Sequence, residues 1–343
     1  MPLMNLKKHY LLFAILISQF IFSQEGIPVF ADYLSDNLSL VHPSMAGASN
    51  ANKIRLTARK QWFDVDNAPN TESANINFRT GDKVGLGGIV YQDENGRFSQ
   101  TGVFVTFAYH LLFSRDRTDL NMLSFGISPG FIQANVNEVG LDDPLDPDPL
   151  IIGREQKYGY FNMDIGVSYN YLDWFAHFTV KNALPITRTL FDNPNNTIIE
   201  PNNQRRYVFS LGRTFGLRNG SWAIEPSILY QATDRTKENA IDANLKMYKG
   251  FGEIATLWGG LSYRRNFDGA EFSQTGIEIE SQKLQYITPF LGINYKHWLV
   301  GYTYSYQSYS VVLSNGGFHQ LTLGYDFGKR KERWDCHCPA VNN

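Results

Sequence analysis

The sequence predicts an all-β protein, a transmembrane antiparallel β-barrel of the outer-membrane type with about 14 strands. Three observations predict this fold. Apolar and polar residues alternate along most of the chain, short and long connections separate the alternating segments in turn, and the chain begins with an export signal. After that signal, no stretch of the sequence is apolar enough to form a membrane helix.

The first segment has the features of a cleaved signal peptide. Lys7 and Lys8 precede an almost unbroken apolar run that ends at Phe22, and cleavage after Ser23 leaves Gln24 as the new N-terminus. The run has about 13 residues, which is too short for the ~20 residues of a membrane anchor. We therefore predict a signal peptide over residues 1–23. Residues 24–52 follow as a periplasmic or plug-like segment ahead of the first strand.

Strict alternation identifies the strands. Near the middle of the chain Phe161, Ile165 and Val167 alternate with Asp164 and Ser168, a period of two that a helix cannot produce. The pattern predicts a barrel over residues 53–328. Its fourteen expected strands are 53–65, 70–79, 83–92, 97–110, 120–132, 157–171, 173–181, 204–215, 221–231, 240–249, 254–265, 284–296, 297–307 and 317–327.

Short and long connections alternate along the chain between these strands. One set is mostly short, whereas the other contains the long polar loops 133–156, 182–203 and 266–283. Short turns in the periplasm and long loops outside the cell are typical of outer-membrane barrels. The sequence therefore predicts an integral protein of the bacterial outer membrane with these loops at the cell surface.

The two faces of the strands differ in polarity. One face is apolar, and the other is rich in Ser, Thr, Asn, Gln and Gly, so we expect the apolar face to contact lipid and the polar face to line a lumen. Aromatic residues lie near strand ends, where interfacial girdles form. Six charged residues are at strand positions expected to face the lumen, where they could line a pore or pair with one another. They are Arg55, Arg59, Arg79, Asp164, Glu225 and Arg264.

The chain lacks the features of an enzyme or a nucleic-acid-binding protein. Its net charge is −2, and no catalytic motif or metal-binding signature is present. Two segments could be considered as metal sites, the Asp-Pro loop around Asp142–Asp148 and the Cys336-His337-Cys338 tail, but both depart from known ligand spacings. We predict no catalytic residue, cofactor or metal, and a periplasmic tail over residues 329–343.

Two short motifs resemble the PorP/SprF family of type IX secretion system proteins from the Bacteroidota. Before the first strand, Pro43 and Gly47 match the family's Asn-Pro-Ala-x-x-Gly element, while His42 and Ser44 depart from it. The segment 318–327 resembles the family's closing strand, and Cys338-Pro339 resembles the Cys-Pro pair in the tail of relatives.

The resemblance implies a non-enzymatic role in protein secretion. Such a protein would bind a secreted adhesin or gliding-motility protein through the cargo's type IX C-terminal domain, would contact other secretion subunits and would lie in outer-membrane lipid. Aromatic residues near the long loops are candidate anchors for this partner: Tyr158, Phe191 and Phe272. The alternative is a transport channel, either porin-like or similar to the fatty-acid transporter FadL, for which a hydrophobic substrate would require an apolar lumen.

Overall fold

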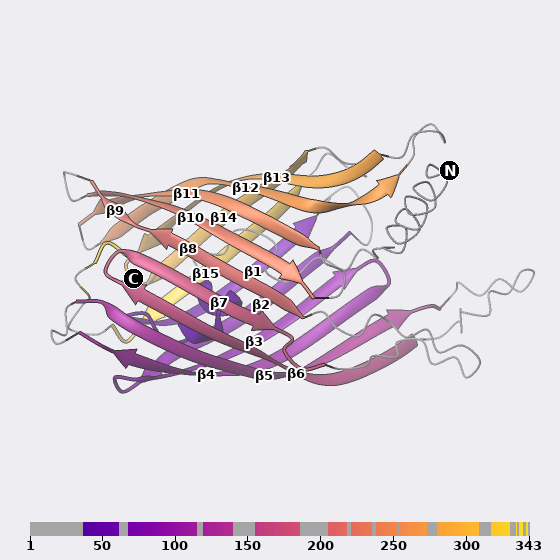
Figure 1. Ribbon diagram of the computed structural model, residues 1–343, viewed down its shortest axis with the longest axis horizontal. Helices are drawn as coiled ribbons and strands as arrows, with labels where there is room; N and C mark the ends of the chain where they lie inside the picture. The colour runs from indigo at the N-terminus through magenta and orange to yellow at the C-terminus, as the bar shows by residue number, and fades with distance from the viewer. Residues whose placement is uncertain are drawn as a thin grey trace, which may run out of the picture.

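The chain forms one antiparallel sheet that closes on itself. The computed structural model describes residues 37–61, 68–114, 119–139, 155–185, 205–217, 221–234, 238–252, 254–272, 280–308, 317–329, 334, 336–338 and 341. Strand β1 (Asn52–Gln61) pairs with β15 (Phe318–Phe327), which joins the first strand to the last (Figure 1). The predicted fold class, a closed all-β barrel of fourteen strands, is confirmed.

Each predicted strand overlaps a strand of the structure. Between β1 and β15 lie β2 (Asn70–Thr80), β3 (Val84–Asn95), β4 (Phe98–Leu112), β5 (Asn121–Asn137), β6 (Glu155–Tyr171), β7 (Trp174–Lys181), β8 (Arg206–Arg213), β9 (Phe215–Gly216), β10 (Trp222–Thr233), β11 (Asn239–Phe251), β12 (Ala255–Phe272), β13 (Glu280–Tyr295) and β14 (Trp298–Ser308). Two short helical turns, α2 (Leu38–Val41) and η1 (Pro43–Met45), precede β1. No helix in the described part of the chain is long and apolar enough to cross a membrane.

Three prolines within strands interrupt their ladders but leave the register unchanged. Pro226 on β10 lies opposite Arg213, in the gap that separates the β10–β8 ladder from the β10–β9 ladder. Strand β10 pairs with β8 and with β9 in the same register. Strands β8 and β9 are therefore two parts of one strand. Pro129 and Pro289 lie at similar gaps in the β4–β5 and β13–β14 ladders. A proline has no N–H to donate to a ladder. At each gap an inward-facing hydrogen bond joins the two strands: Thr106 with Ser128 at 2.8 Å, Thr214 with Glu225 at 3.1 Å, and Thr288 with Ser305 at 2.9 Å.

Strands β12 and β13 are longer than the sequence predicted. Residues 266–272 and 280–283 belong to these strands, so most of the predicted loop 266–283 is wrong. The register shifts between Arg265 and Gly269, and such an irregularity breaks the alternation from which a strand is recognised. Phe272 is consequently the last residue of β12 and not a loop residue.

An apolar band surrounds the outside of the barrel. On β6 the outward side chains from Phe161 to Tyr171 are apolar and, apart from the half-buried Met163, exposed, whereas Glu155 and Lys157 follow toward the long-loop end. Ten residues of strand extend about 33 Å, which corresponds to about 25 Å along the barrel axis at a usual tilt of about 40°. This height matches the hydrocarbon thickness that outer-membrane barrels cross.

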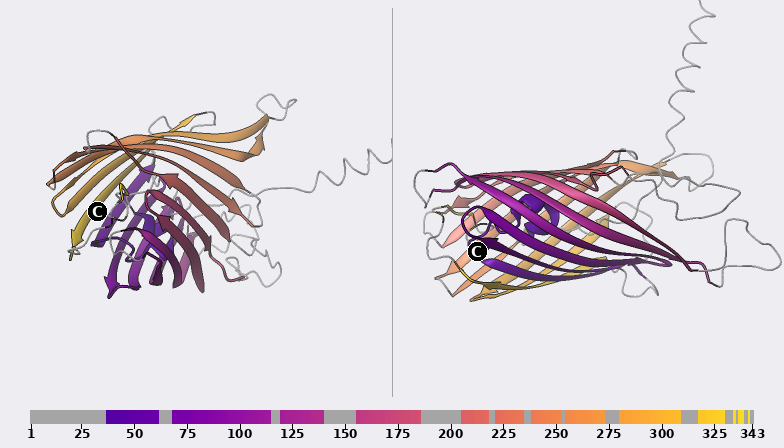
Figure 2. Two further views of the ribbon diagram at one scale, coloured as in Figure 1. Left: turned by 60° about the vertical axis from the view of Figure 1, so that its left-hand side comes forward. Right: turned by 90° about the horizontal axis from the view of Figure 1, so that it is seen from below.

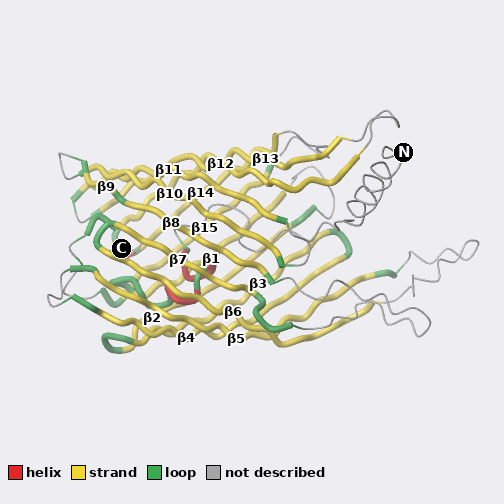
Figure 3. The backbone as a smooth tube through the Cα atoms, in the orientation of Figure 1, coloured by secondary structure: helices red, strands yellow, loops and turns green. Residues whose placement is uncertain are grey.

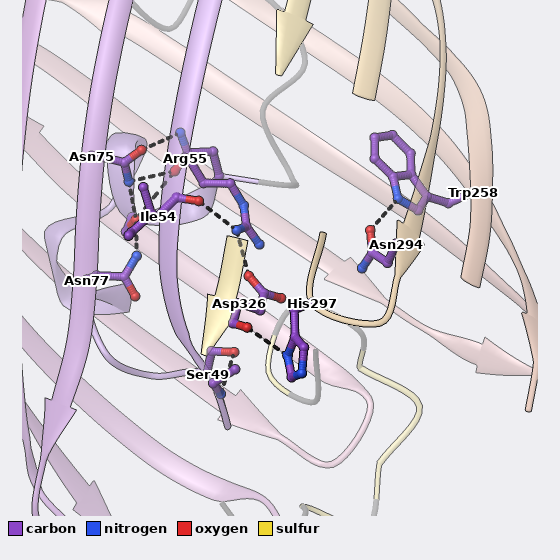
Figure 4. Close-up of polar contacts among 12 residues, drawn as sticks. Ser49, Ile54, Arg55, Asn75, Asn77, Trp258, Asn294, His297 and Asp326 are labelled. Atoms are coloured by element: carbon purple, nitrogen blue, oxygen red, sulfur yellow. Dashed lines mark hydrogen bonds and ion pairs between the residues drawn. The ribbon is translucent and has the colours of Figure 1, made fainter. Parts of the chain in front are cut away.

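Three pairs of opposite charges lie inside the barrel. At the closing seam Arg55 Nη1 donates to Asp326 Oδ1 at 2.6 Å, and Gly324 leaves room for the guanidinium group (Figure 4). Lys181 pairs with Asp164 at 2.8 Å, and Arg264 pairs with Asp242 at 2.6 Å. Of the two possibilities that the sequence left open for these charges, these pairs support internal pairing.

Candidate functional site: a segment inside the barrel

Residues 37–51, called here the lumenal segment, lie inside the barrel. Figures 2 and 3 show α2 and η1 surrounded by the curved sheet. Its contacts are with the inner wall formed by β2 to β8, and it leads into β1 at Asn52. The segment therefore occupies one side of the lumen in the half of the barrel near the short turns.

Local sequence explains the shape of this segment. Pro43 is at the first position of η1, where its missing N–H costs no hydrogen bond and its fixed φ suits a helical turn. Gly47 has φ +66°, a conformation that glycine adopts readily and other residues rarely adopt. Together they bend the chain so that it reverses from η1 toward β1.

His42 connects the segment to two strands of the wall. Its side chain is fully buried, with Nδ1 2.8 Å from Thr179 Oγ1 on β7 and Nε2 2.9 Å from Ser210 Oγ on β8. Its ring also lies 5.0 Å from the ring of His177, between centroids. Both ring nitrogens thus have a partner, as buried polar groups require.

Pro43 and Ser44 pack directly against glycines of the wall. A Cβ at Gly126 would lie 2.2 Å from Ser44 N, and a Cβ at Gly166 would lie 3.1 Å from the Pro43 ring. The Ser44 hydroxyl is hydrogen-bonded to the Ser168 hydroxyl on β6 at 2.5 Å. The wall is therefore made of small residues where the backbone of η1 approaches it.

A similar close approach occurs at Gly47. A Cβ at Gly47 would lie 2.8 Å from the Cα of Gly85, and a Cβ at Gly85 would overlap the carbonyl oxygen of Ala46. The Gly47 N–H donates to Asn77 Oδ1 at 3.3 Å. Glycine at position 47 is thus required twice, by its φ and by its contact with β3.

Asparagines on β2 hold the start of the segment. The Asn75 side-chain amide donates to Asn37 Oδ1 at 2.9 Å and to Ser39 Oγ at 3.0 Å, and Asn77 also donates to Ser39 Oγ at 3.0 Å. Figure 4 shows Asn75 and Asn77 side by side on this wall. These bonds fix the start of the segment against β2.

Leu40 and Val41 of the segment belong to an apolar cluster within the lumen. The cluster contains buried wall residues from β3, β4, β5, β6 and β8: Ile89, Tyr91, Phe104, Ile132, Tyr160 and Val208. Tyr158 packs against it and stacks on Tyr160, with ring centroids 5.9 Å apart. The expectation of a polar lumen is wrong at this place, because these wall residues face protein instead of water.

The C-terminal tail packs against the opposite end of the segment. Trp334, Cys338 and Val341 form a second apolar cluster with Met45 and Ala48, and the Asn50 N–H donates to the Val341 carbonyl at 2.8 Å. Within the described residues, no three His, Cys, Asp or Glu side chains are grouped as metal ligands would be.

The tail is also attached to the turn between β6 and β7. The His337 N–H donates to Asp173 Oδ1 at 2.7 Å, and the Cys338 thiol donates to the Leu172 carbonyl at 2.8 Å. A hydrogen bond with Cys336 and burial of the thiol both raise the pKa of Cys338 above its usual value. The buried Cys338 is therefore a protonated thiol at neutral pH.

The structure brings together the three motif residues that the sequence singled out, His42, Pro43 and Gly47. The candidate anchor Tyr158 lies on β6 beside the first apolar cluster, whereas Phe191 lies outside the described residues. Sequence reasoning missed the wall residues that receive the segment: Gly85, Gly126, Gly166, Thr179 and Ser210. Glycines at inward-facing strand positions could have indicated where the segment packs, since glycine in a strand often marks the close approach of another backbone.

Comparison with known proteins gives one family and several solved structures of low sequence identity. The family model described as "Type IX secretion system membrane protein PorP/SprF" matches residues 22–325. Comparison with curated protein sequences found no significant match.

Among solved structures, the TodX deltaS2S3 mutant monoaromatic hydrocarbon channel has a TM-score of 0.48 at 9% identity, over 84% of this chain and 94% of that one. The KdgM porin has a TM-score of 0.33 at 11% identity, over 80% and 99%. BamA from Haemophilus ducreyi lacking POTRA domains 1–3 has a TM-score of 0.38 at 9% identity, over 80% and 70%.

Proposed function

Because the chain belongs to the PorP/SprF family of type IX secretion system membrane proteins, we propose that it is a non-enzymatic, outer-membrane component of that system that binds a secreted surface protein. The cargo is an adhesin or a gliding-motility protein, recognised through its C-terminal domain and either anchored at the cell surface or helped across the membrane. Other subunits of the secretion system are further partners.

The observation that carries this proposal is the lumenal segment. It is held against the inner wall by hydrogen bonds at His42 and Ser44 and by the apolar packing of Leu40 and Val41. A barrel that fills one side of its lumen with its own chain is better suited to holding a partner at its end than to conducting solutes. We propose that the segment is a plug.

The length of four strands supports a docking surface at the long-loop end. Strands β5 and β6 have 17 residues each, β12 has 18 and β13 has 16, whereas about 9–11 residues cross a membrane. The surplus residues of β5 and β6 continue past the apolar band with the polar, exposed Gln133, Glu155 and Lys157 on their outer face. We propose that these projecting hairpins, with Tyr158, Phe191 and Phe272 as aromatic anchors, contact the cargo.

One observation favours the alternative of a FadL-like or porin-like transport channel. Aromatic and aliphatic side chains do line part of the lumen, as a hydrophobic substrate would require. In the structure, however, Leu40 and Val41 pack against these side chains. A transport role would require the lumenal segment to leave its place.

Co-purification tests the proposal. The tagged full-length protein is isolated from outer membranes in mild detergent, and the proteins bound to it are identified by mass spectrometry. We expect one large surface protein to be enriched, and we expect its loss from a variant in which loop residues 186–204 are shortened. A variant with a shortened turn at residues 218–220, at the opposite end, is the control. The same co-purifying proteins in all three samples would contradict docking at the long loops.

A further inference from the structure

A cluster of cations and aromatic rings lies on the outer face of the barrel at the short-turn end. It is called here the interfacial cluster and consists of Trp174, Arg213, Phe215, Trp222 and Lys249. Trp174 is paired with Arg213, and Trp222 is paired with Lys249, and residues directly opposite each other in a ladder point to the same face. Trp174 and Trp222 are 47% and 40% exposed, which places both pairs on the lipid-facing side.

Each cation of the cluster lies over aromatic rings. The guanidinium carbon of Arg213 is 4.9 Å from the ring centroid of Trp174 and 4.5 Å from that of Phe215. Lys249 Nζ is 4.6 Å from the ring centroid of Trp222 and 3.1 Å from Ser221 Oγ. Such contacts hold a cation at the edge of an apolar region without neutralising its charge.

Neither cation pairs with an acidic side chain among the described residues. Within the part of the chain that the structure describes, no carboxylate forms an ion pair with Arg213 or Lys249, and Arg213 Nε is buried without a hydrogen-bond partner. Asp173, beside Trp174 in sequence, is bound by the N–H and the ring of His337. The positive charge of the cluster is therefore available to an external anion.

The position of the cluster indicates the source of that anion. Toward the long-loop end the same outer face continues with exposed apolar side chains on β7, β8, β10 and β11: Phe178, Phe209, Ile228, Leu245 and Met247. The cluster thus lies where the hydrocarbon ends and the lipid headgroups begin, which is also where tryptophans gather in membrane proteins. The anionic group of this layer is the phosphodiester of a phospholipid.

We propose that the interfacial cluster binds the headgroup phosphate of an anionic phospholipid in the leaflet at the short-turn end. Arg213 offers the planar donors that suit phosphate oxygens, and Lys249 adds a second positive charge two strands away and four ladder positions closer to the short-turn end. Trp174, Phe215 and Trp222 contact the glycerol and the first methylenes of the same lipid. The site is independent of the proposed cargo function, because it faces the membrane and not the lumen.

The test compares lipid retention by the full-length protein and its variants. Wild type and the double variant Arg213→Gln/Lys249→Gln are placed in phosphatidylcholine nanodiscs that contain added phosphatidylglycerol, and bound lipid is counted by native mass spectrometry. Each lost cation lowers the preference for phosphatidylglycerol roughly fivefold. The matched control is Lys157→Gln, an outward lysine at the other end of the barrel that pairs with Glu155 at 3.2 Å; its preference stays that of wild type.

Three results would overturn the proposal. The double variant could keep the wild-type preference, the control could lose as much as the double variant, or soluble glycerol phosphate could displace the lipid, which would indicate a site for free anions. Heat-dependent migration in SDS gels reports whether each variant is folded. If the double variant does not fold, wild type alone decides, because equal retention of phosphatidylcholine and phosphatidylglycerol contradicts the site.

Discussion

Replacing Gly126 with alanine should displace the lumenal segment without unfolding the barrel. A Cβ at this position would lie 2.2 Å from Ser44 N and 2.3 Å from Pro43 C, whereas ordinary contacts begin at 3.4 Å. The difference between 3.4 and 2.2 Å means that η1 must move by about 1.2 Å, because the obstructing atoms belong to the backbone and cannot rotate away.

The expected cost follows from the bonds that this movement breaks. A shift of about 1 Å disrupts three hydrogen bonds, two at His42 and one at Ser44, each with a net value of about 1 kcal/mol. If the segment stays in place instead, overpacking costs ~1–3 kcal/mol. On either course the docked segment is destabilised by roughly 1–3 kcal/mol, which favours its detachment. The ladders of the wall keep their hydrogen bonds, so the barrel remains closed.

Disulfide trapping measures the position of the segment directly. Ser44 and Ser168 are replaced by cysteine in a variant that lacks Cys336 and Cys338, since the two hydroxyls touch in the structure. Oxidation should cross-link the pair almost completely in the otherwise native protein. Adding Gly126→Ala should reduce the cross-linked fraction to background.

The control is Gly88→Ala on the outer face of β3, away from the lumenal segment. A Cβ at Gly88 would meet nothing closer than Ile76 Cγ2 at 3.7 Å, so the change introduces no clash. Cross-linking in the Gly88 variant should equal that of the parent. If Gly126→Ala also cross-links fully and melts at the same temperature, η1 does not pack against Gly126 and the geometry described above is refuted.

Three further predictions follow from other parts of the molecule. Arg55→Gln leaves Asp326 buried without its cation, so guanidinium unfolding in lipid vesicles should show a loss of about 3–5 kcal/mol; an unchanged midpoint would mean that the seam does not depend on this pair. At about pH 7.5 a maleimide should label the partly exposed Cys336 and spare the buried Cys338, because the raised pKa of Cys338 keeps its thiol protonated. Cys338 should react only when the pH is raised further or the tail is detached. Equal labelling of both cysteines would contradict the packing of the tail. Tyr158→Ala should weaken cargo retention at least tenfold if this residue is an anchor, while a pull-down indistinguishable from wild type would remove it from the interface.

Much of the barrel could be predicted from the sequence because a lipid-facing wall imposes its alternation on every strand. Side chains such as Val167 and Ser168 differ in polarity because one contacts lipid and the other the lumen. Alternation does not predict the ends of β12 and β13, because the register shift between Arg265 and Gly269 breaks the period of two.

The placement of the lumenal segment could not be predicted in the same way. Its hydrogen bonds join His42 to residues 137 and 168 positions away, and nothing in the local pattern of residues 37–51 indicates which strands they will meet. The motif Pro43 and Gly47 marked the segment as unusual through resemblance alone. The physical reason, close packing against glycines of the wall, is visible only in the folded structure.

Deletion of the gene tests the central claim, that this barrel holds a secreted protein at the outer membrane, most directly. Surface-exposed proteins of the deletion strain, the parent and the complemented strain are released by protease shaving and quantified, and uptake of small solutes is measured through growth in the same cultures. We expect the deletion strain to lose one or a few large surface proteins, to regain them on complementation and to grow as the parent does. Unchanged surface proteins together with a defect in the uptake of one solute would contradict the docking role and support transport through the lumen.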